Sequence, residues 1–357
     1  MERFGFVGLP NAGKSTLYNA LAGGGAEAAP YPFATTDANV GVAKVPDHRV
    51  EAVAAVSGSR QVVPAPIQFV DIGGLVEGAS RGEGLGNRFL AGIREVDGIV
   101  YVLRSFADAD VAGSTDVGGQ LAVLEVELCL ADLESVESRL DKRTKAAQAD
   151  RSLADQAAAL GEAAEHLAAG VPLYRAGLGE RLALLRDEFL LTSKPAMAVV
   201  NVGEDGLDAA DAAVEPVREV LGERAPVVPM CVQLEAEAAQ LPADERAELL
   251  EGLGLGEGAI ARFARAAYEL LGLRTFFTTR EKETRAWPFR VGATAGECAG
   301  LVHTDFERQF VRAEVIAWDD LVEIGSWAKA RELGRLRVEG RGYEVADGDV
   351  LEIRHTA

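Results

Sequence analysis

The chain has 357 residues, of which 48% are hydrophobic, and it carries a formal net charge of -20. This length is enough for two or three domains, each with its own core. The large negative charge argues against a protein that coats DNA, RNA or an anionic membrane non-specifically, because such binding needs lysine and arginine to neutralise phosphates.

The cysteines and the first residues indicate the cellular environment. Cys129, Cys231 and Cys298 lie far apart in the chain, a spacing that predicts three buried thiols and neither a disulfide framework nor a CxxC metal site. A strand is predicted to begin within a few residues of Met1, and no run of about 18 apolar residues occurs. We therefore expect a cytoplasmic protein with no signal peptide and no membrane span.

Residues 8–15 read GLPNAGKS, a complete GxxxxGKS phosphate loop. The loop follows an apolar segment, 4–7, that predicts a buried strand, and it precedes a predicted helix over 15–21. In such a loop successive backbone N–H groups point at a phosphate, Lys14 meets the β and γ oxygens, and the Ser15 hydroxyl meets Mg²⁺. We predict a nucleoside triphosphate at Asn11, Ala12, Gly13, Lys14, Ser15 and Thr16.

Two further segments fit a nucleotide switch. Residues 31–36 read YPFATT, where Thr35 could close on Mg²⁺ and the γ-phosphate, or the segment could be a plain surface turn. After a predicted strand over 67–70, residues 71–74 read DIGG, a DxxG in which Asp71 can reach Mg²⁺ and the Gly74 N–H can meet the γ-phosphate. DxxG is a weak signal alone, but ligands of open α/β sheets gather at the carboxyl ends of strands.

The residues that contact the nucleotide base are expected after two more predicted strands, 98–103 and 195–200. The second ends in Asn201-Val202-Gly203-Glu204, where GTP-binding relatives carry NKxD. Glu204 and Val202 replace the Asp and the Lys, so guanine selectivity should weaken; Asn201 could read adenine N7 and N6, or the segment could be a polar turn. Phe106 could pack on the base or be an ordinary buried residue. We also expect Cys231, Val232 and Gln233 at the nucleotide.

The segment between these strands, about 121–191, is rich in Ala, Leu and Glu and predicts an antiparallel helical hairpin. Its apolar residues recur at steps of three and four: Val126, Leu130, Leu133, Val136 and Leu140, then Leu153, Ala157, Leu160, Ala164 and Leu167. Its charged outer faces predict solvated surface, with a partner-binding arm as the alternative.

From about residue 276 the pattern changes to short strands and turns, with Gly348 marking a turn between two strands. The densest basic cluster of the chain lies here: Lys329, Arg331, Arg335, Arg337 and Arg341. This cluster is a candidate RNA-facing patch or a solvated basic face.

Several of these segments together resemble the YchF / Obg-like ATPase family: GLPNAGKS, YPFATTDANVG at 31–41, DIGGLVEGAS at 71–80, GEGLGNRFL at 82–90, NVGE, and the tail at 287–316. The resemblance covers nearly the whole chain. It implies a Ras-like nucleotide domain with a helical insertion, a C-terminal TGS domain of β-grasp type, a preference for ATP or its acceptance beside GTP, and association with ribosomes.

The catalytic groups are less conventional. Leu75 stands where many related GTPases place a water-orienting Gln, and the segment 106–113, FADADVAG, lacks the histidine that family members commonly carry there. An aliphatic side chain cannot orient water, so we expect slow hydrolysis. Asn11 could help to hold K⁺ against the phosphates, as in potassium-activated relatives, or it could simply stabilise the loop. The catalytic candidates are Asn11 and the Gly74 backbone.

The sequence thus predicts an α/β protein with a Ras-like P-loop domain at 1–120 and 192–275, a hairpin insertion at 121–191 and a β-grasp TGS domain at 276–357. We expect an ATP-preferring NTPase that acts as a switch on ribosomes or ribosomal RNA, with Mg²⁺ bound by Ser15, Thr35 and Asp71, and K⁺ as an additional candidate ion. The alternatives are a GTP-specific switch and a nucleotide-gated binding protein without turnover; a small-molecule kinase is disfavoured. We expect a monomer that binds neither DNA nor membrane.

Overall fold

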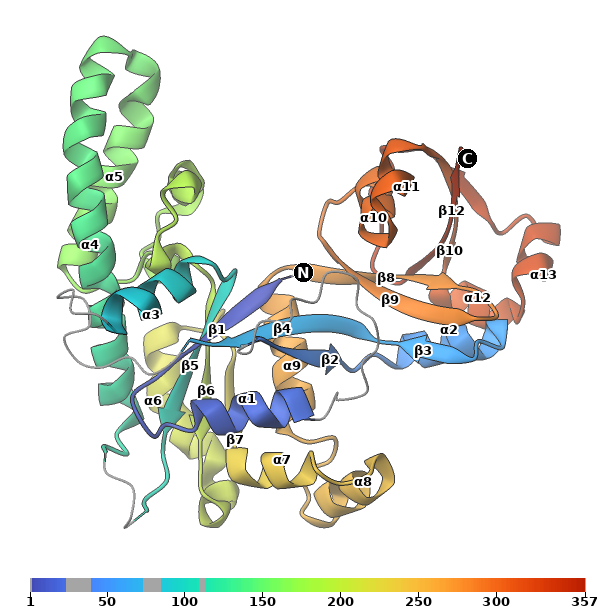
Figure 1. The fold of residues 1–357 in the computed structure, drawn as a ribbon, viewed down its shortest axis with the longest axis horizontal. Coiled ribbons are helices and arrows are strands. Elements are labelled where there is room, and N and C mark those ends of the chain that lie inside the picture. Colours follow the sequence, from blue (N-terminus) through green and yellow to red (C-terminus); the bar gives the residue numbers. More distant parts are fainter. Residues whose placement is uncertain (1, 24–39, 73–84, 109–112, 357) are drawn as a thin grey trace.

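The computed structural model describes residues 2–23, 40–72, 85–108 and 113–356, and Figure 1 shows their arrangement. A first sheet has six strands in the order β2-β4-β1-β5-β6-β7. Only β2 runs antiparallel to its neighbour, β4. The strands are β1 (Arg3–Val7), β2 (Val40–Val45), β4 (Ala65–Asp71), β5 (Gly98–Arg104), β6 (Ala196–Asn201) and β7 (Val227–Met230).

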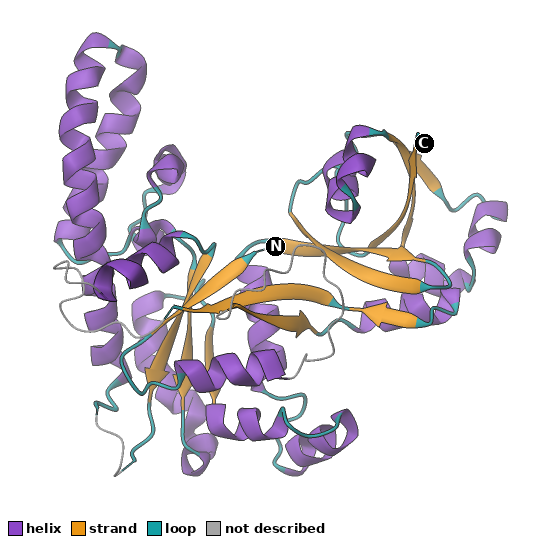
Figure 2. Ribbon diagram, in the orientation of Figure 1, coloured by secondary structure: helices purple, strands orange, loops and turns teal. Residues whose placement is uncertain are grey.

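Helices cover both faces of this sheet (Figure 2). One face packs on α1 (Lys14–Gly23) and α9 (Ala259–Leu270), the other on α3 (Leu85–Arg94), α4 (Val117–Ala149) and α6 (Ala210–Leu221). Every residue of β5 is buried, as expected for a parallel strand covered on both sides. Beside α1 lies α7 (Val232–Ala238), which contacts α8 (Ala243–Gly252). The predicted α/β class is confirmed.

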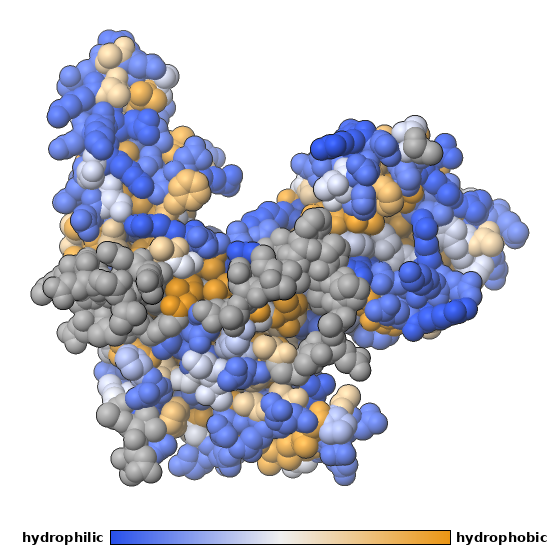
Figure 3. Space-filling view, in the orientation of Figure 1, coloured by the Kyte–Doolittle hydropathy of each residue, from blue (hydrophilic) through white to orange (hydrophobic). Residues whose placement is uncertain are grey.

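The predicted hairpin is α4, a 3-10 turn at Arg151–Leu153 and α5 (Ala154–Ala168), which project from the sheet as an arm (Figure 1). Short 3-10 segments, Leu173–Arg175, Gly179–Glu188 and Leu191–Ser193, lead back to β6. The outer arm carries mainly hydrophilic side chains (Figure 3). No helix in the described ranges combines the length and the apolar character needed to cross a membrane.

The arm differs from its prediction in two respects. Its first helix, α4, begins at Val117, ahead of residue 121, and its first turns cover the sheet through Leu121 and Leu124. The predicted apolar series was also partly wrong, because Val126 and Leu130 are 45% and 44% exposed. The inner seam combines buried members of the predicted series, Val136, Leu160 and Leu167, with three small residues that the series missed, Cys129, Ala159 and Ala163.

A second six-stranded sheet has the order β11-β10-β12-β8-β9-β3. Its strands are β3 (Gln61–Val63), β8 (Leu273–Thr279), β9 (Glu283–Arg290), β10 (Phe310–Ala317), β11 (Arg337–Glu339) and β12 (Asp349–His355). One face packs on α10 (Ala295–Val302), followed by α11 (Thr304–Arg308); the other packs on α12 (Trp318–Ile324) and α13 (Trp327–Glu332). Gly348, with a φ of 88°, forms the turn directly before β12.

The two sheets are joined by a segment from the first half of the chain. After β2 the chain enters α2 (His48–Ser57), which packs on β8, β9 and α12, and then β3, which pairs in parallel with β9. Arg49 of α2 bonds Asp347, in the turn before β12, at 2.9 Å and Asp47 at 2.8 Å. One core cluster contains Val50 and Val53 of α2 together with Phe69 of the first sheet and Phe277 of the second. The part of the chain between β2 and β4 thereby belongs with the second sheet.

Candidate nucleotide-binding site

The phosphate loop connects β1 to α1, in the predicted strand, loop and helix context. A side chain at Gly8 would come 2.5 Å from the carbonyl oxygen of Val102, and Gly13 has a φ of 99° with Asn201 pressed against it. Both positions therefore require glycine, because the backbone comes too close or is left-handed. The result is a loop that leads its N–H groups to the start of a helix, which is a ready anion site.

Lys14 is 7% exposed, and its ammonium donates to the carbonyl oxygens of Gly8 at 2.9 Å and Leu9 at 2.8 Å. Burial lowers the pKa of Lys14, while the charge of Asp71 acts in the opposite direction. The loop's own carbonyls thus hold the ammonium in place before any ligand arrives. A charge fixed in this way suits an anion of high charge density.

The Ser15 hydroxyl donates to an Asp71 carboxylate oxygen at 2.9 Å. Both are hard oxygen ligands of the kind that Mg²⁺ takes, so the residues present fit this ion. The described residues contain no group of three or more His, Cys, Asp or Glu that could hold a metal. Thr35, Gly74 and Leu75 lie outside the described residues.

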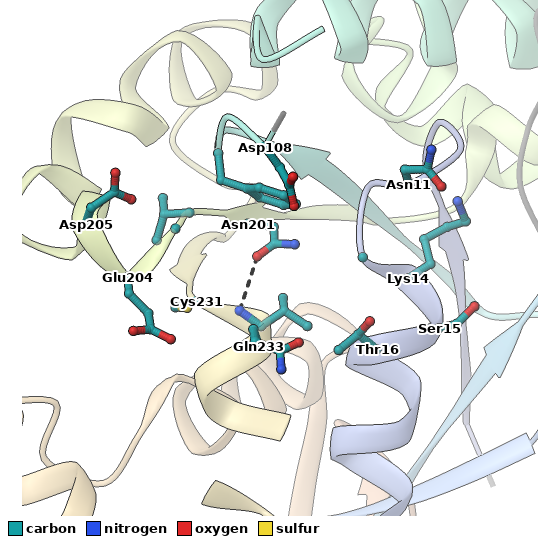
Figure 4. Close-up of a pocket in the computed structure, with 15 residues that line it drawn as sticks. Asn11, Lys14, Ser15, Thr16, Asp108, Asn201, Glu204, Asp205, Cys231 and Gln233 are labelled. Atoms are coloured by element: carbon teal, nitrogen blue, oxygen red, sulfur yellow. Dashed lines mark hydrogen bonds between the residues drawn. The ribbon is translucent and has the colours of Figure 1, made fainter. Parts of the chain in front are cut away.

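A cavity of about 770 Å³ opens from the phosphate loop to the carboxyl ends of β5, β6 and β7. Figure 4 shows Asn11, Lys14, Ser15 and Thr16 at one end, and Glu204 and Asp205 at the other. The structure brings almost all of the predicted nucleotide-binding residues together here: Asn11, Gly13, Lys14, Ser15, Thr16, Phe106, Asn201, Val202, Glu204, Cys231, Val232 and Gln233. Ala12 lies buried beneath the loop instead.

The Asn201 amide, for which the sequence allows adenine reading or a polar turn, is bonded to backbone groups. Its amide nitrogen donates to the carbonyl oxygen of Ala12 at 3.0 Å, and its amide oxygen accepts from the Val232 N–H at 3.2 Å (Figure 4). The side chain is 5% exposed. Asn201 therefore ties the phosphate loop to the segment after β7, and its amide is engaged with backbone where the sequence also allows an adenine edge.

The far end of the cavity combines an aromatic ring with two carboxylates. Phe106 is half-buried, and the Arg104 guanidinium lies 4.6 Å from the centre of its ring. Glu204 and Asp205 are exposed, whereas Val202 is buried in the core. A flat apolar face beside exposed acceptors suits an aromatic heterocycle that carries N–H donors.

Segment 231–233 forms part of the cavity wall. Burial raises the pKa of the Cys231 thiol, so it is neutral at physiological pH. The Gln233 amide donates to Glu237 at 2.7 Å. These side chains shape the wall and supply no charge of their own to it.

Sequence reasoning missed three lining residues, Asp108, Gly203 and Asp205. Two of them adjoin predicted positions, because Gly203 lies inside NVGE and Asp205 directly follows it. The signal that could have identified Asp205 is the run of two acidic residues at the end of a buried strand, where ligands gather.

The basic cluster of the second sheet is largely paired within its own domain. The arginines contact acceptors nearby: Arg331 with Glu314, Arg335 with Asp320, Arg337 with Asp349, and Arg341 with the carbonyl oxygen of Glu307. Pairing of this kind cancels much of the local positive field. The candidate RNA-facing patch is thus weaker than the sequence indicates.

Comparison with known proteins gives matches over both halves of the chain. Residues 3–139 match a family described as "50S ribosome-binding GTPase", and residues 273–356 match YchF-GTPase_C, described as a protein of unknown function (DUF933). The solved structure of the Schizosaccharomyces pombe YchF GTPase is similar, with a TM-score of 0.87 and 29% identity over 99% of this chain and 97% of that one.

Curated relatives match along the full length. The chain is 43% identical to the "Ribosome-binding ATPase YchF" of Bacillus subtilis over 360 residues, 98% of each chain. It is 45% identical to the protein of the same name from Pasteurella multocida over 368 residues, again 98% of each. At this identity and coverage, and with the Ras-like phosphate-loop domain in place, the chain belongs to the YchF family.

Proposed function

We propose that this protein binds and slowly hydrolyses a nucleoside triphosphate, with ATP preferred, and that the bound nucleotide controls its association with ribosomes. The observation that carries the proposal is the cavity at one edge of the sheet. The phosphate loop, with its Ser15–Asp71 hydrogen bond, lies at one end of it, and Glu204 and Asp205 lie at the other end, where the nucleotide base would bind. The relatives' names, which specify an ATPase that binds ribosomes, agree with it. We also propose that the second sheet is a TGS domain of β-grasp type.

At the phosphate end of the cavity, the triphosphate is bound by the charge of Lys14 and by backbone N–H groups. Lys14 meets the β and γ oxygens, and the N–H groups of residues 11–16 surround the phosphates. Ser15 and Asp71 would hold Mg²⁺, which neutralises charge on the triphosphate when bound. Thr35 and the Gly74 N–H are proposed to complete this end from segments beyond the described residues.

Turnover should be slow, because the chain offers few groups that can orient water. No histidine occurs in 106–113, and Leu75 follows the DxxG. A phosphate-release assay with and without ribosomes tests this part of the proposal. Slow release that ribosomes accelerate is the expected result; absence of release in both conditions would favour a nucleotide-gated binding protein without turnover.

Base choice rests on Val202 and Glu204. In NKxD the Lys packs along the guanine and the Asp accepts hydrogen bonds from guanine N–H groups. In this chain Val202 replaces the Lys, and Glu204, whose side chain is one methylene longer, replaces the Asp. ATP should therefore bind at least as tightly as GTP. Replacing both, Val202→Lys with Glu204→Asp, should shift the preference toward GTP by about 1 to 3 kcal/mol, the worth of one good bidentate base contact.

Calorimetric titration of ATP and GTP against the wild-type and double-variant proteins measures this shift. Because Val202 is 3% exposed, the single variant Glu204→Asp, at an exposed position, serves as the control for loss of packing and should give a smaller shift in the same direction. A strong preference of the unmodified protein for GTP would contradict the proposal and support the GTP-specific alternative.

The route from nucleotide to ribosome is proposed to run through α2 and β3, which lie between Thr35 and Asp71 and pack on the second sheet. Removing the side chain of Arg49, which is 19% exposed and bonds both Asp47 and Asp347, should reduce the difference in ribosome binding between ATP-bound and nucleotide-free protein. Arg60→Ala is the matched control, since its ion pair with Glu281 also joins the α2–β3 segment to the C-terminal half of the chain but is 79% exposed on both sides and contributes little.

Co-sedimentation with ribosomes at a series of protein concentrations gives the comparison. We expect the nucleotide effect to shrink several-fold in Arg49→Ala, which loses a hydrogen-bonded, partly buried charge pair, and to stay at the wild-type value in Arg60→Ala. Equal behaviour of the two variants would show that the route lies elsewhere.

A further inference from the structure

The side chain of Gln120 lies at the junction between the arm and the nucleotide cavity. Gln120 is in the first turns of α4, and it is 3% exposed. Its amide oxygen accepts from the Arg104 N–H at 2.9 Å, and its amide nitrogen donates to the Arg104 carbonyl oxygen at 2.8 Å and to that of Ser114 at 3.0 Å. A buried amide with this many partners fixes the backbone that it contacts.

The position of Arg104 explains why an amide is needed there. In a strand, the N–H and C=O groups of successive residues point alternately toward the neighbouring strand on one side and the neighbouring strand on the other. The Ser105 N–H bonds Asn201 of β6 at 2.8 Å, while β1, on the other side, ends at Val7, opposite Tyr101. The groups of Arg104 on the β1 side thus lie past the end of their neighbouring strand. Gln120 takes the place of that strand by offering one acceptor and one donor.

Arg104 in turn supports the wall of the cavity. Its side chain donates from Nε to the Phe106 carbonyl oxygen at 3.0 Å, and its guanidinium lies 4.6 Å from the centre of the Phe106 ring. Arg104 is 3% exposed, and a cation held against a ring face out of water is attracted to it strongly. Gln120 therefore fixes Arg104, and Arg104 fixes the ring at the base end of the cavity.

The same helix forms the arm. The first turns of α4 pack on the sheet, and its later turns project with α5 (Figure 1). A continuous helix moves as one element over short distances, so any shift of the arm's base carries Gln120 with it.

We propose that Gln120 is a positioning residue of the nucleotide site: it links the base of the arm to the Phe106 ring, and so sets the affinity for the base but leaves the affinity for the phosphates unchanged. This inference rests on the proposed binding of a nucleotide in the cavity. It predicts that a shift of the arm changes base binding, whereas Lys14 and Ser15 at the phosphate end are held by other partners: the carbonyl oxygens of Gly8 and Leu9, and the Asp71 carboxylate.

The test compares two ligands that differ in the base and ribose: ATP and inorganic tripolyphosphate, both with Mg²⁺. Gln120→Leu removes the amide while keeping the approximate size of the side chain. We expect its Kd for ATP to rise on the order of ten-fold, the scale of losing a base–aromatic stack, and its Kd for tripolyphosphate to stay within about two-fold of the wild-type value. Phe106→Ala should show the same pattern, and the double variant should be no weaker than Phe106→Ala alone.

Two further variants serve as controls. Gln156→Leu removes an amide of the outer arm, which contacts Leu184 and Glu188, and should change neither affinity. Gln120→Glu keeps the acceptor for the Arg104 N–H but sets an acceptor oxygen against the carbonyl oxygens of Arg104 and Ser114, and should give an ATP-specific loss at least as large as that of Gln120→Leu; it also replaces Gln120→Leu as the test if that variant fails to fold, as judged by circular dichroism.

The possible outcomes distinguish failure of the Gln120 inference from failure of the proposed nucleotide-binding function. If the wild-type protein binds neither ATP nor tripolyphosphate, the proposed nucleotide function itself fails. If it binds both and the Gln120 variants lose affinity for both equally, or add to Phe106→Ala, the inference alone is overturned. Loss confined to ATP, absent in Gln156→Leu, supports it.

Discussion

Replacing Lys14 with alanine is expected to weaken the binding of ATP by about 2 to 5 kcal/mol, the cost of removing one partner of a buried, hydrogen-bonded charge pair, while the binding of AMP changes little. The ammonium is held at the loop by the carbonyl oxygens of Gly8 and Leu9, so its charge acts at the position of the β and γ oxygens, which AMP lacks. Titrations of ATP, ADP and AMP against both proteins measure the difference.

A matched control is Lys44→Ala, which removes an exposed lysine of β2 that does not line the cavity. It should leave all three affinities at the wild-type values. Because burial lowers the pKa of Lys14, the ammonium loses its charge at a lower pH than an ordinary lysine, and ATP affinity should fall as pH rises through that range. Equal losses for ATP and AMP in Lys14→Ala would contradict the assigned role.

Hydrolysis should be faster in K⁺ than in Na⁺ at equal ionic strength, and this difference should depend on Asn11. Asn11 is exposed and lines the cavity at its phosphate end, where its amide oxygen could help to hold a cation against the phosphates. A monovalent cation there would offset charge that develops as the γ-phosphoryl group leaves. Such preorganised charge is worth about ten-fold or more in rate and much less in ground-state affinity.

The choice of variant follows from the backbone. Asn11 has a φ of 62°, a left-handed conformation that alanine adopts only with strain. Asn11→Gly therefore removes the amide without that cost, and it should abolish the K⁺ effect on phosphate release while ATP affinity stays nearly constant. Equal wild-type rates in matched KCl and NaCl buffers would remove the case for an Asn11-bound ion.

The parts of the site that the sequence predicts are those encoded locally. The phosphate loop needs only a strand, the glycines and a helix in order, so residues 8–15 could be placed from their own neighbourhood. The role of Asn201 could not, because its partners, Ala12 and Val232, come from two other segments of the chain. Gln120 carries no motif at all; its importance depends on where β1 happens to end.

The same distinction holds for the fold. Periodicity predicts that α4 is a helix, but which of its apolar residues are buried depends on which face meets α5, and Val126 and Leu130 face outward. Strand β3 has only three residues, and its partner β9 lies in the other half of the chain. A pairing of this kind leaves no local pattern to detect.

The incorporation of α2 and β3 into the second sheet has a consequence for how the chain acquires its structure during synthesis. Residues 48–63 leave the ribosome early, but β8, β9 and α12, on which they pack, are made much later, within residues 273–324. At about 5 to 20 residues per second the wait lasts roughly 10 to 50 seconds. During that time the apolar face of α2 and the edge of β3 have no native partner, which makes them the segment of the nascent chain most in need of protection from aggregation.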